Sequence, residues 1–295
     1  MFERLGWAPS SVTARVDRIS ITNGDVSVDV PVRGAIVDRP AMLAEMRARC
    51  DAEFVRAGVE SVRAEGEGYA LRLRDGSEAR CRWLIGADGS RSAVRRDLFR
   101  EGPTNRRAIV NCIAAGSEEA LTFRVGGPFA GGYAWRFPSK PGTVSVGFPV
   151  GDAMPRDVEG VISWGSRDLP YGAMEKVADG RCMLVGDAAC LANPICYGGI
   201  GAALLSGKRA AEAVLSGRPS RYQRWVSRDI MFDGHFMKAH RQFSEWDDAE
   251  IAEAIEPFRG GYSVWRGAAH AISHPRRFNV LLATFIAFRV GWRVG

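Results

Sequence analysis

The chain has 295 residues, of which 46% are hydrophobic and 25% charged, and its formal net charge is +6. This length provides a core for one large or two modest domains, and the composition is that of a globular protein. The positive charge does not indicate nucleic-acid binding, because the sequence has no nucleic-acid-binding motif and no arginine-rich tract with interleaved aromatic residues. No signal peptide is recognisable and none of the six cysteines forms a C-x-x-C pair, so we expect a cytoplasmic protein with free thiols.

Hairpin patterns dominate the first part of the chain. Residues 12–30 alternate between apolar and polar positions around Asn23-Gly24, which predicts two strands joined by a tight turn. The further elements expected before residue 86 are a helix over 41–57, a short strand over 59–63, and a hairpin with strands over 69–73 and 78–85 around Asp75-Gly76.

A strand-to-helix turn is predicted next. The apolar run at 83–85 leads into Asp88-Gly89, and either Ser90 or Ser92 stands where a helix N-cap is expected. Such a turn has a purely structural role in many proteins, so its function depends on what lies beside it.

Residues 106–150 are predicted to form strands, with a hairpin through Pro141-Gly142. Tyr133, Trp135 and Phe137 alternate along one of these strands, so their side chains share one face. This aromatic face either packs in the core or lines a pocket, and the two roles are compatible. A short helix is expected over 155–164.

The stretch from Gly180 to Glu212 has the pattern of a buried parallel strand followed by a loop and a helix. The strand covers 182–185, and Asp187 follows at its carboxyl end, where open α/β sheets bind ligands. A loop with Pro194 leads to Gly198 and Gly199, which open a helix rich in small residues. A carboxylate for hydroxyl groups and an electropositive helix end thus come from one segment.

The last part of the chain is predicted to be helical, over 221–243 and 247–258. His235 and His240 are five residues apart, which does not fit two metal ligands on one helix face, so no metal site is expected. Residues 259–295 contain six arginines and no acidic residue, with Trp265, Trp292 and an apolar run over 278–288 that is too short to span a bilayer. This segment is either an interfacial helix on anionic lipid or a helix docked on its own domain or on a partner.

Three motifs together resemble the geranylgeranyl reductase family of FAD-dependent oxidoreductases, within the flavoprotein hydroxylase-like superfamily. The segment from Gly186-Asp187-Ala188-Ala189 to Glu212 is similar to its second flavin-binding motif, and 87–95 is similar to its A-D-G-x-x-S-x-x-R motif. Residues 133–138 resemble its Y-x-W-x-F-P motif. At one position the chain departs from the pattern, because Tyr197 stands where the family has the first glycine of P-x-x-G-x-G.

The resemblance implies an α/β (α+β) fold of the FAD/NAD(P)-binding type, with an inserted antiparallel substrate sheet and a helical C-terminus. The expected division is an FAD-binding-type domain over 1–100 and 179–217, a substrate sheet over 101–178 and a helical region over 218–295. The implied FAD-binding residues are Arg39, Asp88, Gly89, Asp187, Pro194, Gly198, Gly199 and Ile200. Tyr133, Trp135 and Phe137 are implied to line the substrate pocket. Arg39 matches a family arginine before the first helix, although a surface arginine at a helix start is the alternative.

The implied activity is reduction of isoprenoid double bonds in lipid or prenyl precursors. The G-x-G-x-x-G fingerprint that binds the ADP half of FAD is absent, so the FAD-binding domain is expected to be N-terminally truncated. This absence and Tyr197 favour an alternative, in which the chain is a non-catalytic remnant or one subunit of a split flavoprotein whose partner supplies the ADP-binding unit. A flavin-dependent monooxygenase is a second alternative. No catalytic residue is assigned, since nothing in the sequence chooses between Cys196 and Tyr197 as a proton donor.

Overall fold

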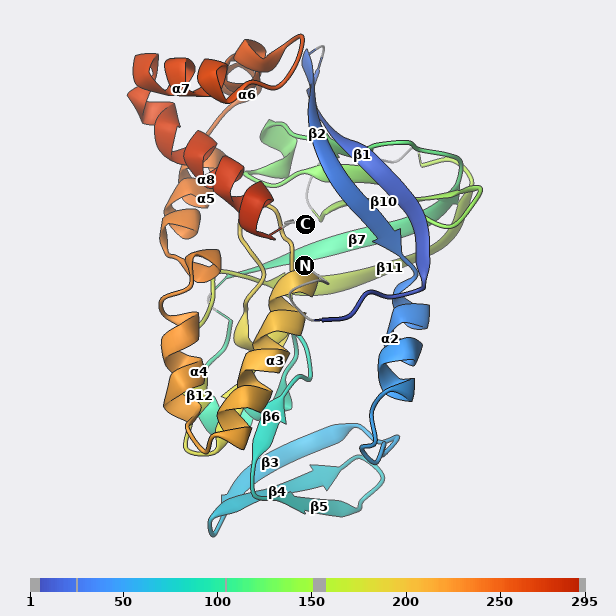
Figure 1. Cartoon of the computed structure of the whole chain (residues 1–295), viewed down its shortest axis with the longest axis vertical. Helices are drawn as coiled ribbons and strands as arrows, with labels where there is room; N and C mark the ends of the chain where they lie inside the picture. The colour runs from blue at the N-terminus through green and yellow to red at the C-terminus, as the bar shows by residue number, and fades with distance from the viewer. Residues whose placement is uncertain (1–5, 25, 104, 151–157, 292–295) are drawn as a thin grey trace. The chain divides into compact units, whose positions relative to one another are not determined.

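The computed structural model of the protein describes residues 6–24, 26–103, 105–150 and 158–291 (Figure 1). Two compact units share the chain, and each contains segments far apart in the sequence. Unit 1 comprises residues 1–51, 107–167 and 237–295, and unit 2 comprises residues 52–106 and 168–236. The predicted domain ranges divide the chain differently, because the first hairpin belongs to the large sheet of unit 1.

Unit 1 is built on a seven-stranded sheet in the order β11-β7-β10-β9-β8-β1-β2. The first hairpin is confirmed, since β1 and β2 pair in antiparallel fashion and flank the predicted Asn23-Gly24 turn. Strand β1 then pairs in parallel with β8, with Ile19 opposite Leu121. The bounds are β1 Val12–Asn23, β2 Val26–Val37, β7 Arg106–Ala115, β8 Leu121–Arg124, β9 Ala134–Pro138, β10 Thr143–Pro149 and β11 Val161–Pro170.

The predicted helix over 155–164 is wrong for its described part. Residues 159–160 form a turn, and the chain then enters strand β11 at Val161. The residue types explain why this segment is a strand, because β-branched and aromatic residues such as Val161, Ile162 and Trp164 favour β-structure. All three side chains are exposed on the edge strand β11, so the segment has no buried apolar face of the kind that would stabilise a helix. Residues 155–157 lie outside the described ranges.

The helices of unit 1 are α2 Arg39–Ala48, α5 His235–Ser244, α6 Asp248–Ile255, α7 Val264–Ser273 and α8 Pro275–Gly291, with 3-10 turns η2 Gly127–Phe129 and η5 Glu256–Phe258. Helix α2 begins after its cap Asp38, with a proline in the first turn, and ends nine residues before the predicted position. Helix α6 carries a capping box formed by Asp247 and Glu250. The predicted apolar run over 278–288 lies within α8, while Trp292 and Arg293 lie outside the described residues.

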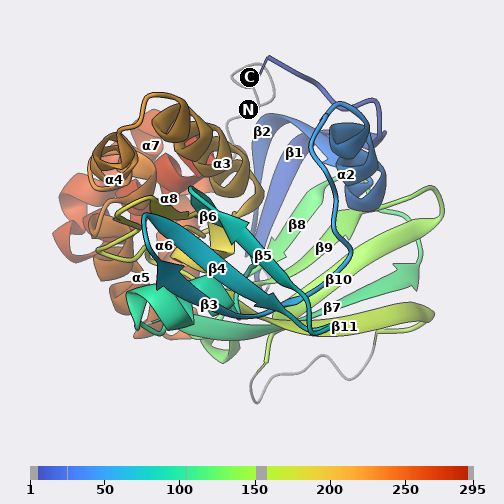
Figure 2. The same ribbon diagram turned by 90° about the horizontal axis from the view of Figure 1, so that it is seen from below.

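Unit 2 contains two three-stranded sheets, in the orders β3-β4-β5 and β12-β13-β6. Figure 2 shows β3, β4 and β5 side by side. The predicted strand over 78–85 is divided by a bend at 82–83, because its first half pairs with β4 and its second half pairs with β13. The bounds are β3 Val59–Glu65, β4 Gly68–Leu73, β5 Glu78–Cys81, β6 Leu84–Gly86, β12 Ala178–Asp179 and β13 Cys182–Leu184.

The helical elements of unit 2 are η1 Arg95–Phe99, η3 Gly186–Ala189, α3 Ile200–Leu215, α4 Pro219–Val226 and η4 Ile230–Phe232. The strand predicted over 182–185 is confirmed as β13, which ends one residue earlier at Leu184, and the helix predicted after Gly199 is confirmed as α3. The helix expected over 221–243 is instead interrupted twice, at Asp229 and Asp233. Each of these aspartates accepts a hydrogen bond from a backbone N–H two residues later, at 3.0 Å and 2.8 Å, which starts a new helical segment.

Among the residues that the structure describes, no helix combines the length and apolarity needed to cross a membrane.

Helix α5 buries a histidine that predicts how stability changes with pH. His240 is 6% exposed, and burial, followed by the nearby charges of Arg107 and Arg241, lowers its pKa to about 4. As the pH falls below 6.5, the His240 side chain is therefore protonated in the unfolded chain but stays neutral in the folded chain until about pH 4.

We expect the free energy of unfolding to be highest above pH 6.5 and to fall by about 2 kcal/mol at pH 4.5 through this residue. Urea unfolding of the wild type and His240→Leu at both pH values measures this loss, which should shrink in the variant. An equal loss in both proteins would contradict the assignment.

Candidate functional site

Parallel pairing of β6 with β13 brings the two predicted cofactor loops together in unit 2. Leu84 lies opposite Cys182 and Gly86 opposite Leu184, so both strands end at the same edge of the sheet. The loop that begins at Asp88 follows β6, and the loop that begins at Asp187 follows β13. In open α/β sheets ligands bind outside this carboxyl edge.

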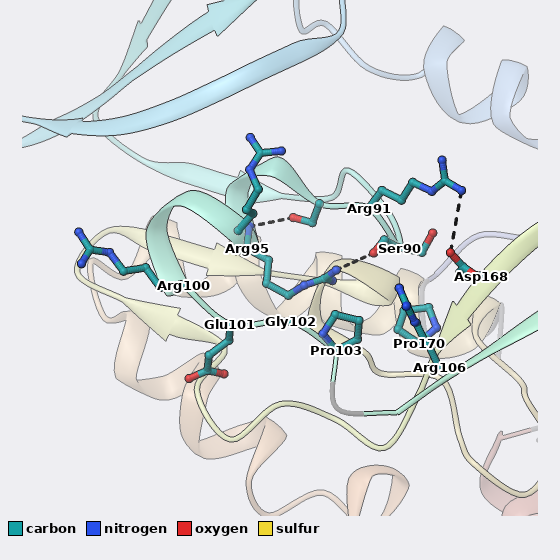
Figure 3. A pocket seen from close by; sticks show the side chains of 12 residues that line it. Ser90, Arg91, Arg95, Arg100, Glu101, Gly102, Pro103, Arg106, Asp168 and Pro170 are labelled. Atoms are coloured by element: carbon teal, nitrogen blue, oxygen red, sulfur yellow. Dashed lines mark hydrogen bonds and ion pairs between the residues drawn. The ribbon is translucent and has the colours of Figure 1, made fainter.

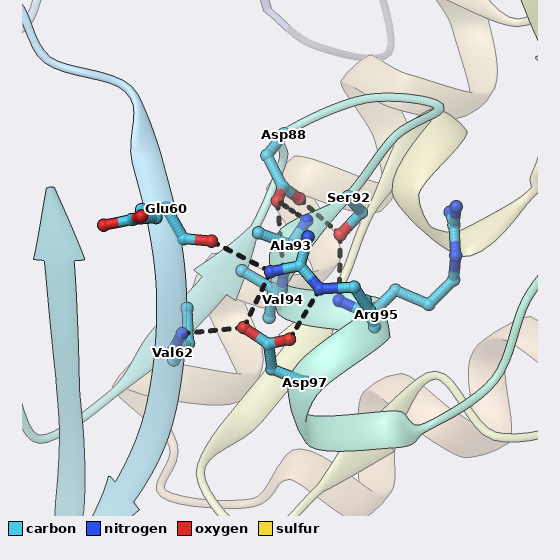
Figure 4. A network of polar contacts seen from close by, with 9 residues as sticks. Glu60, Val62, Asp88, Ser92, Ala93, Val94, Arg95 and Asp97 are labelled. Carbon is cyan, nitrogen blue, oxygen red and sulfur yellow. Dashed lines mark hydrogen bonds and ion pairs between the residues drawn. The ribbon is translucent and has the colours of Figure 1, made fainter. Parts of the chain in front are cut away.

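The Asp88 carboxylate caps the helical turn that follows it (Figure 4). It accepts hydrogen bonds from Ser92 Oγ at 2.6 Å, from the Ala93 N–H at 2.7 Å and from the Val94 N–H at 3.2 Å. Ser92 Oγ in turn accepts from the Arg95 N–H at 2.9 Å, so Ser92 is confirmed as an N-cap. Asp88 thus fixes the shape of the loop, and Gly89 takes the left-handed φ of +77° that its turn requires.

A second network attaches the same helical turn to strand β3. Asp97 accepts from the Val62 N–H at 2.9 Å and pairs with Arg96 at 2.7 Å, and Arg96 also donates to the Glu60 carbonyl. The hydrogen bond from Arg96 holds the pKa of Asp97 below its usual value. Figure 4 shows this network on the side of the turn that faces β3.

Arg95 joins the two loops across the edge of the sheet. Its side chain is 4% exposed, and its guanidinium donates to the Ala188 carbonyl at 2.8 Å, to the Asp187 carbonyl at 3.3 Å and to the Ser90 carbonyl at 2.5 Å. A buried guanidinium that bonds backbone carbonyls of both loops fixes their relative position.

The Asp187 carboxylate lies at the N-terminus of helix α3. A Cβ added to Gly199 would be 3.5 Å from Asp187 Oδ1, so the carboxylate and the first turn of the helix are neighbours. The N-cap residue of this helix, Gly199, has no side chain that could cap it, and the start of an α-helix suits an anion or a carbonyl oxygen. Gly186 sits tightly against α3, since its N–H donates to Ser206 Oγ at 3.1 Å.

The loop before α3 is compact and contains a strained residue. Asn193 Oδ1 accepts from the N–H groups of Ile195 and Cys196, and Pro194 is buried. Tyr197 adopts a left-handed φ of +48°, the conformation that favours the glycine expected at this position. Its ring contacts the ring of Tyr171 at a centroid distance of 5.7 Å.

The remaining predicted residues of this loop differ in exposure. Gly198 and Gly199 are half-buried, while Ile200 is 41% exposed at the first position of α3. Cys190 and Cys196 are both buried, and burial raises the pKa of the Cys190 thiol to about 11. Neither thiol is therefore in a position to react readily with solutes at neutral pH.

An arginine-lined cavity of about 690 Å³ opens beside the Asp88 loop (Figure 3). Figure 3 shows Arg91 reaching toward Asp168, to which it is paired at 4.0 Å, and Arg106 beside Pro170. Within the described ranges, Arg100 and Arg106 have no ion-pair partner. The charged residues of the wall are Arg91, Arg95, Arg96, Arg100, Arg106, Glu101 and Asp168. This excess of guanidinium groups suits an anion such as phosphate.

Sequence reasoning missed this arginine cavity. Its signal was present, since arginines recur every one to six residues from Arg91 to Arg106. The pattern did not show that they surround one cavity, because Asp168 and Pro170 join the wall from a distant part of the chain.

The other predicted site residues belong to unit 1. Arg39 is an exposed residue at the first position of α2. Trp135 and Phe137 lie on β9 and Tyr133 directly precedes it, and their rings form a row with 6.2 Å between successive centroids. The Trp135 indole covers Gly147 on the neighbouring strand so closely that any Cβ there would clash. The single aromatic face predicted from the alternation is confirmed.

No group of three histidine, cysteine or acidic side chains that could hold a metal ion occurs in the part of the chain that the structure describes.

Comparisons of the whole chain with known proteins find relatives of modest sequence identity. A digeranylgeranylglycerophospholipid reductase of Methanosarcina acetivorans is 33% identical over 46% of this chain and 40% of its own length. A menaquinone reductase of Mycobacterium tuberculosis is 27% identical over 70% of this chain and 61% of its own length. The chain thus spans less than two thirds of these curated relatives. No protein-family model matches it.

Solved structures share the fold. A geranylgeranyl bacteriochlorophyll reductase-like protein from Thermoplasma acidophilum superposes with a TM-score of 0.74 at 18% identity, covering 92% of this chain and 83% of that one. HpxO of Klebsiella pneumoniae, determined in complex with FAD and uric acid, has a TM-score of 0.56 at 15% identity, with 96% and 85% covered. The chain is a homologue of geranylgeranyl-type reductases and has a flavoprotein hydroxylase-like fold, which confirms the resemblance drawn from the motifs.

We expect Asp88→Ala to lower the free energy of unfolding by about 2 kcal/mol, because three donors of the Asp88 loop lose their acceptor. Asp51→Ala is the matched control, an exposed aspartate of the same chain whose removal should change stability by less than about 0.5 kcal/mol. Urea unfolding measures both. Equal stability of the two variants would show that the cap contributes nothing.

Proposed function

We propose that the chain is an FAD-dependent oxidoreductase that reduces double bonds of isoprenoid chains in lipid or prenyl precursors. The observation that carries the proposal is the parallel pairing of β6 with β13, which places two flavin-type loops at one edge of a sheet. The names of the homologues, digeranylgeranylglycerophospholipid reductase and menaquinone reductase, support a reductase that acts on lipid-like molecules.

Unit 2 fits FAD at the start of helix α3. The Asp187 carboxylate accepts hydrogen bonds, which suits the ribityl hydroxyls of the cofactor. The N–H groups at the start of α3, next to Gly199, suit the carbonyl edge of the flavin ring, where reduction adds negative charge that the helix dipole stabilises. The backbone of Tyr197 is in the left-handed region, and its ring contacts the ring of Tyr171.

The arginine-lined cavity beside the Asp88 loop is a second place where unit 2 suits FAD. The guanidinium groups of Arg100 and Arg106 suit the pyrophosphate of FAD, because a guanidinium can donate two parallel hydrogen bonds to phosphate oxygens. Asp88 then contributes indirectly, since its carboxylate is occupied in shaping the loop that bears Arg91 and Arg95.

When bound and reduced, FAD supplies a hydride to one alkene carbon, and a proton completes the other. The aromatic row Tyr133, Trp135 and Phe137 offers an apolar face for an isoprenoid chain. Positioning is the main contribution expected, because alkene reduction needs alignment of two atoms more than it needs charged side chains in the substrate pocket.

Helices α7 and α8 support contact with a lipid surface. Trp265 is 85% exposed and Ile272 82% exposed on one face of α7, and Phe278 is exposed at the start of α8. Arg266 and Arg276 are exposed on the same two helices, as expected for a surface that meets anionic headgroups.

The flavin proposal predicts that the purified chain binds added FAD and that Asp187→Ala weakens this binding at least about tenfold, because a charged acceptor is lost. Titration of FAD fluorescence measures the affinity, and Asp51→Ala is the matched control with unchanged affinity. A folded wild-type chain that binds no FAD would contradict the proposal.

Mass spectrometry of a geranylgeranyl lipid incubated with the reduced, FAD-loaded protein decides the reaction class. A gain of two hydrogens per reacted double bond supports the reductase. With O2 present in the assay, incorporation of one of its oxygen atoms would instead identify a flavin-dependent monooxygenase.

For the lipid surface, we expect Trp265→Ala to lower binding to phosphatidylglycerol vesicles about tenfold, since a large apolar side chain no longer enters the interface. Trp164→Ala is the control, because Trp164 is also largely exposed, at 73%, but lies on β11. Vesicle sedimentation measures both. If the two variants lose affinity equally, α7 is not the contact.

A further inference from the structure

Strand β11 is an exposed edge of the large sheet in unit 1. Among the described strands β7 is its only neighbour, and every residue from Val161 to Arg167 is exposed. Ile162 is 62% exposed and shares a face with the exposed Trp164, while Val161 is exposed on the opposite face. Figure 2 shows β11 at the border of the sheet, beside β7. Such an edge is a template for pairing with another strand.

The two edges of the sheet differ in how they are protected. The opposite edge strand, β2, contains Pro31, which has no backbone N–H, and its pairing with β1 shifts register at that point. Both features hinder the addition of a further strand. Residues 161–166 of β11 contain neither a proline nor a charged residue. Strand β11 therefore lacks the protection that β2 has.

The backbone of β11 has hydrogen-bonding groups that point away from the sheet. The Gly160 carbonyl accepts a hydrogen bond from the Ala115 N–H at 2.9 Å, so this carbonyl points toward β7. In a trans peptide the next N–H, that of Val161, points the opposite way. Because these directions alternate along an extended strand, the N–H and C=O of Ser163 point outward as well. Ser163 can therefore exchange two hydrogen bonds with a strand added at this edge.

The sequence of β11 complements itself about Ser163. When two copies pair in antiparallel fashion around this residue, Ile162 of each copy lies opposite Trp164 of the other. The two-fold symmetry makes this contact twice. A β-branched residue opposite an aromatic one is a favourable cross-strand pair, so the exposed apolar side chains of one face are covered by their own counterparts.

The charges at the ends of the paired segment are complementary too. In the same register Glu159 of one copy comes to the end of the strand that carries Arg167 of the other. Both side chains are exposed, and neither belongs to an ion pair between residues that the structure describes. Opposite charges thus meet at each end, and like charges do not.

We propose that β11 pairs in antiparallel fashion with β11 of a second copy of this chain, centred on Ser163, and forms a two-fold symmetric dimer. A second copy fits this edge because the apolar pairs and the end charges both complement themselves. Two paired strands form a small interface, so the dimer dissociates reversibly. The dimer includes no residue assigned to the flavin or to the substrate, and it does not depend on the proposed function.

Sedimentation equilibrium of the full chain tests the dimer. We expect a monomer–dimer equilibrium between about 1 and 100 µM. Trp164→Lys should weaken dimerisation at least about tenfold, because both cross-strand apolar pairs are lost. Trp265→Lys is the matched control, since Trp265 is also largely exposed but lies on α7. A chain that is monomeric at the highest of these concentrations, or equal losses in the two variants, would overturn the proposal.

Charge reversal tests the ends of the paired segment. Arg167→Glu should weaken dimerisation about tenfold, because it places two like charges near each other at both ends. Adding Glu159→Arg to this variant exchanges the two charges and should restore the wild-type equilibrium. Arg15→Glu makes the same charge change at an exposed position on β1 and should have no effect. A double variant no better than Arg167→Glu would overturn the pairing.

A short bis-maleimide crosslinker reports the register, in a chain whose exposed Cys50 is replaced by serine. Ser163 lies at the two-fold axis, so Ser163→Cys should give a covalent dimer in high yield. Ser166→Cys is the matched control, because Ser166 is exposed on the same strand but comes opposite Gly160 of the second copy, far from its own counterpart. Equal yields from the two variants would overturn the register centred on Ser163.

Discussion

The parallel pairing of β6 with β13 is the constraint on which the candidate site depends. It sets the Asp88 and Asp187 loops at one edge, and the buried Arg95 guanidinium then joins them through backbone carbonyls. Without that pairing the buried Arg95 cation would lose the Asp187 and Ala188 carbonyls as acceptors, which is costly in a low-dielectric interior. Two different groups thus come to this edge, the start of helix α3 after one loop and a cluster of arginines after the other.

Unit 1 is organised by a different long-range pairing. Strand β1 pairs in parallel with β8, which brings the first hairpin of the chain onto the sheet that carries the aromatic row. The hairpin thereby brings β1 and β2 to one end of the sheet, where they line an apolar groove together with α7 and α8. The same two helices carry the exposed apolar side chains of Trp265, Ile272 and Phe278.

Local chemistry made much of this architecture predictable. Asn23-Gly24 and Asp75-Gly76 specify hairpins within a few residues, and the loop motifs around Asp88 and Asp187 carry their own caps and glycines. The pairing of β1 with β8 was not predictable, because about a hundred residues separate Ile19 from Leu121 and no local signal reports the contact. For the same reason the strand expected over 78–85 could not be divided between two sheets, and the arginine cavity could not be assembled from its sequence spacing.

The central claim is that the edge formed by β6 and β13 holds the flavin. Hydrogen–deuterium exchange of the full chain with and without FAD tests it most directly. The account predicts slower exchange on FAD addition at residues 88–95 and 186–204, which form the two loops and the start of α3. No protection, or protection confined to segments outside these loops, would contradict it.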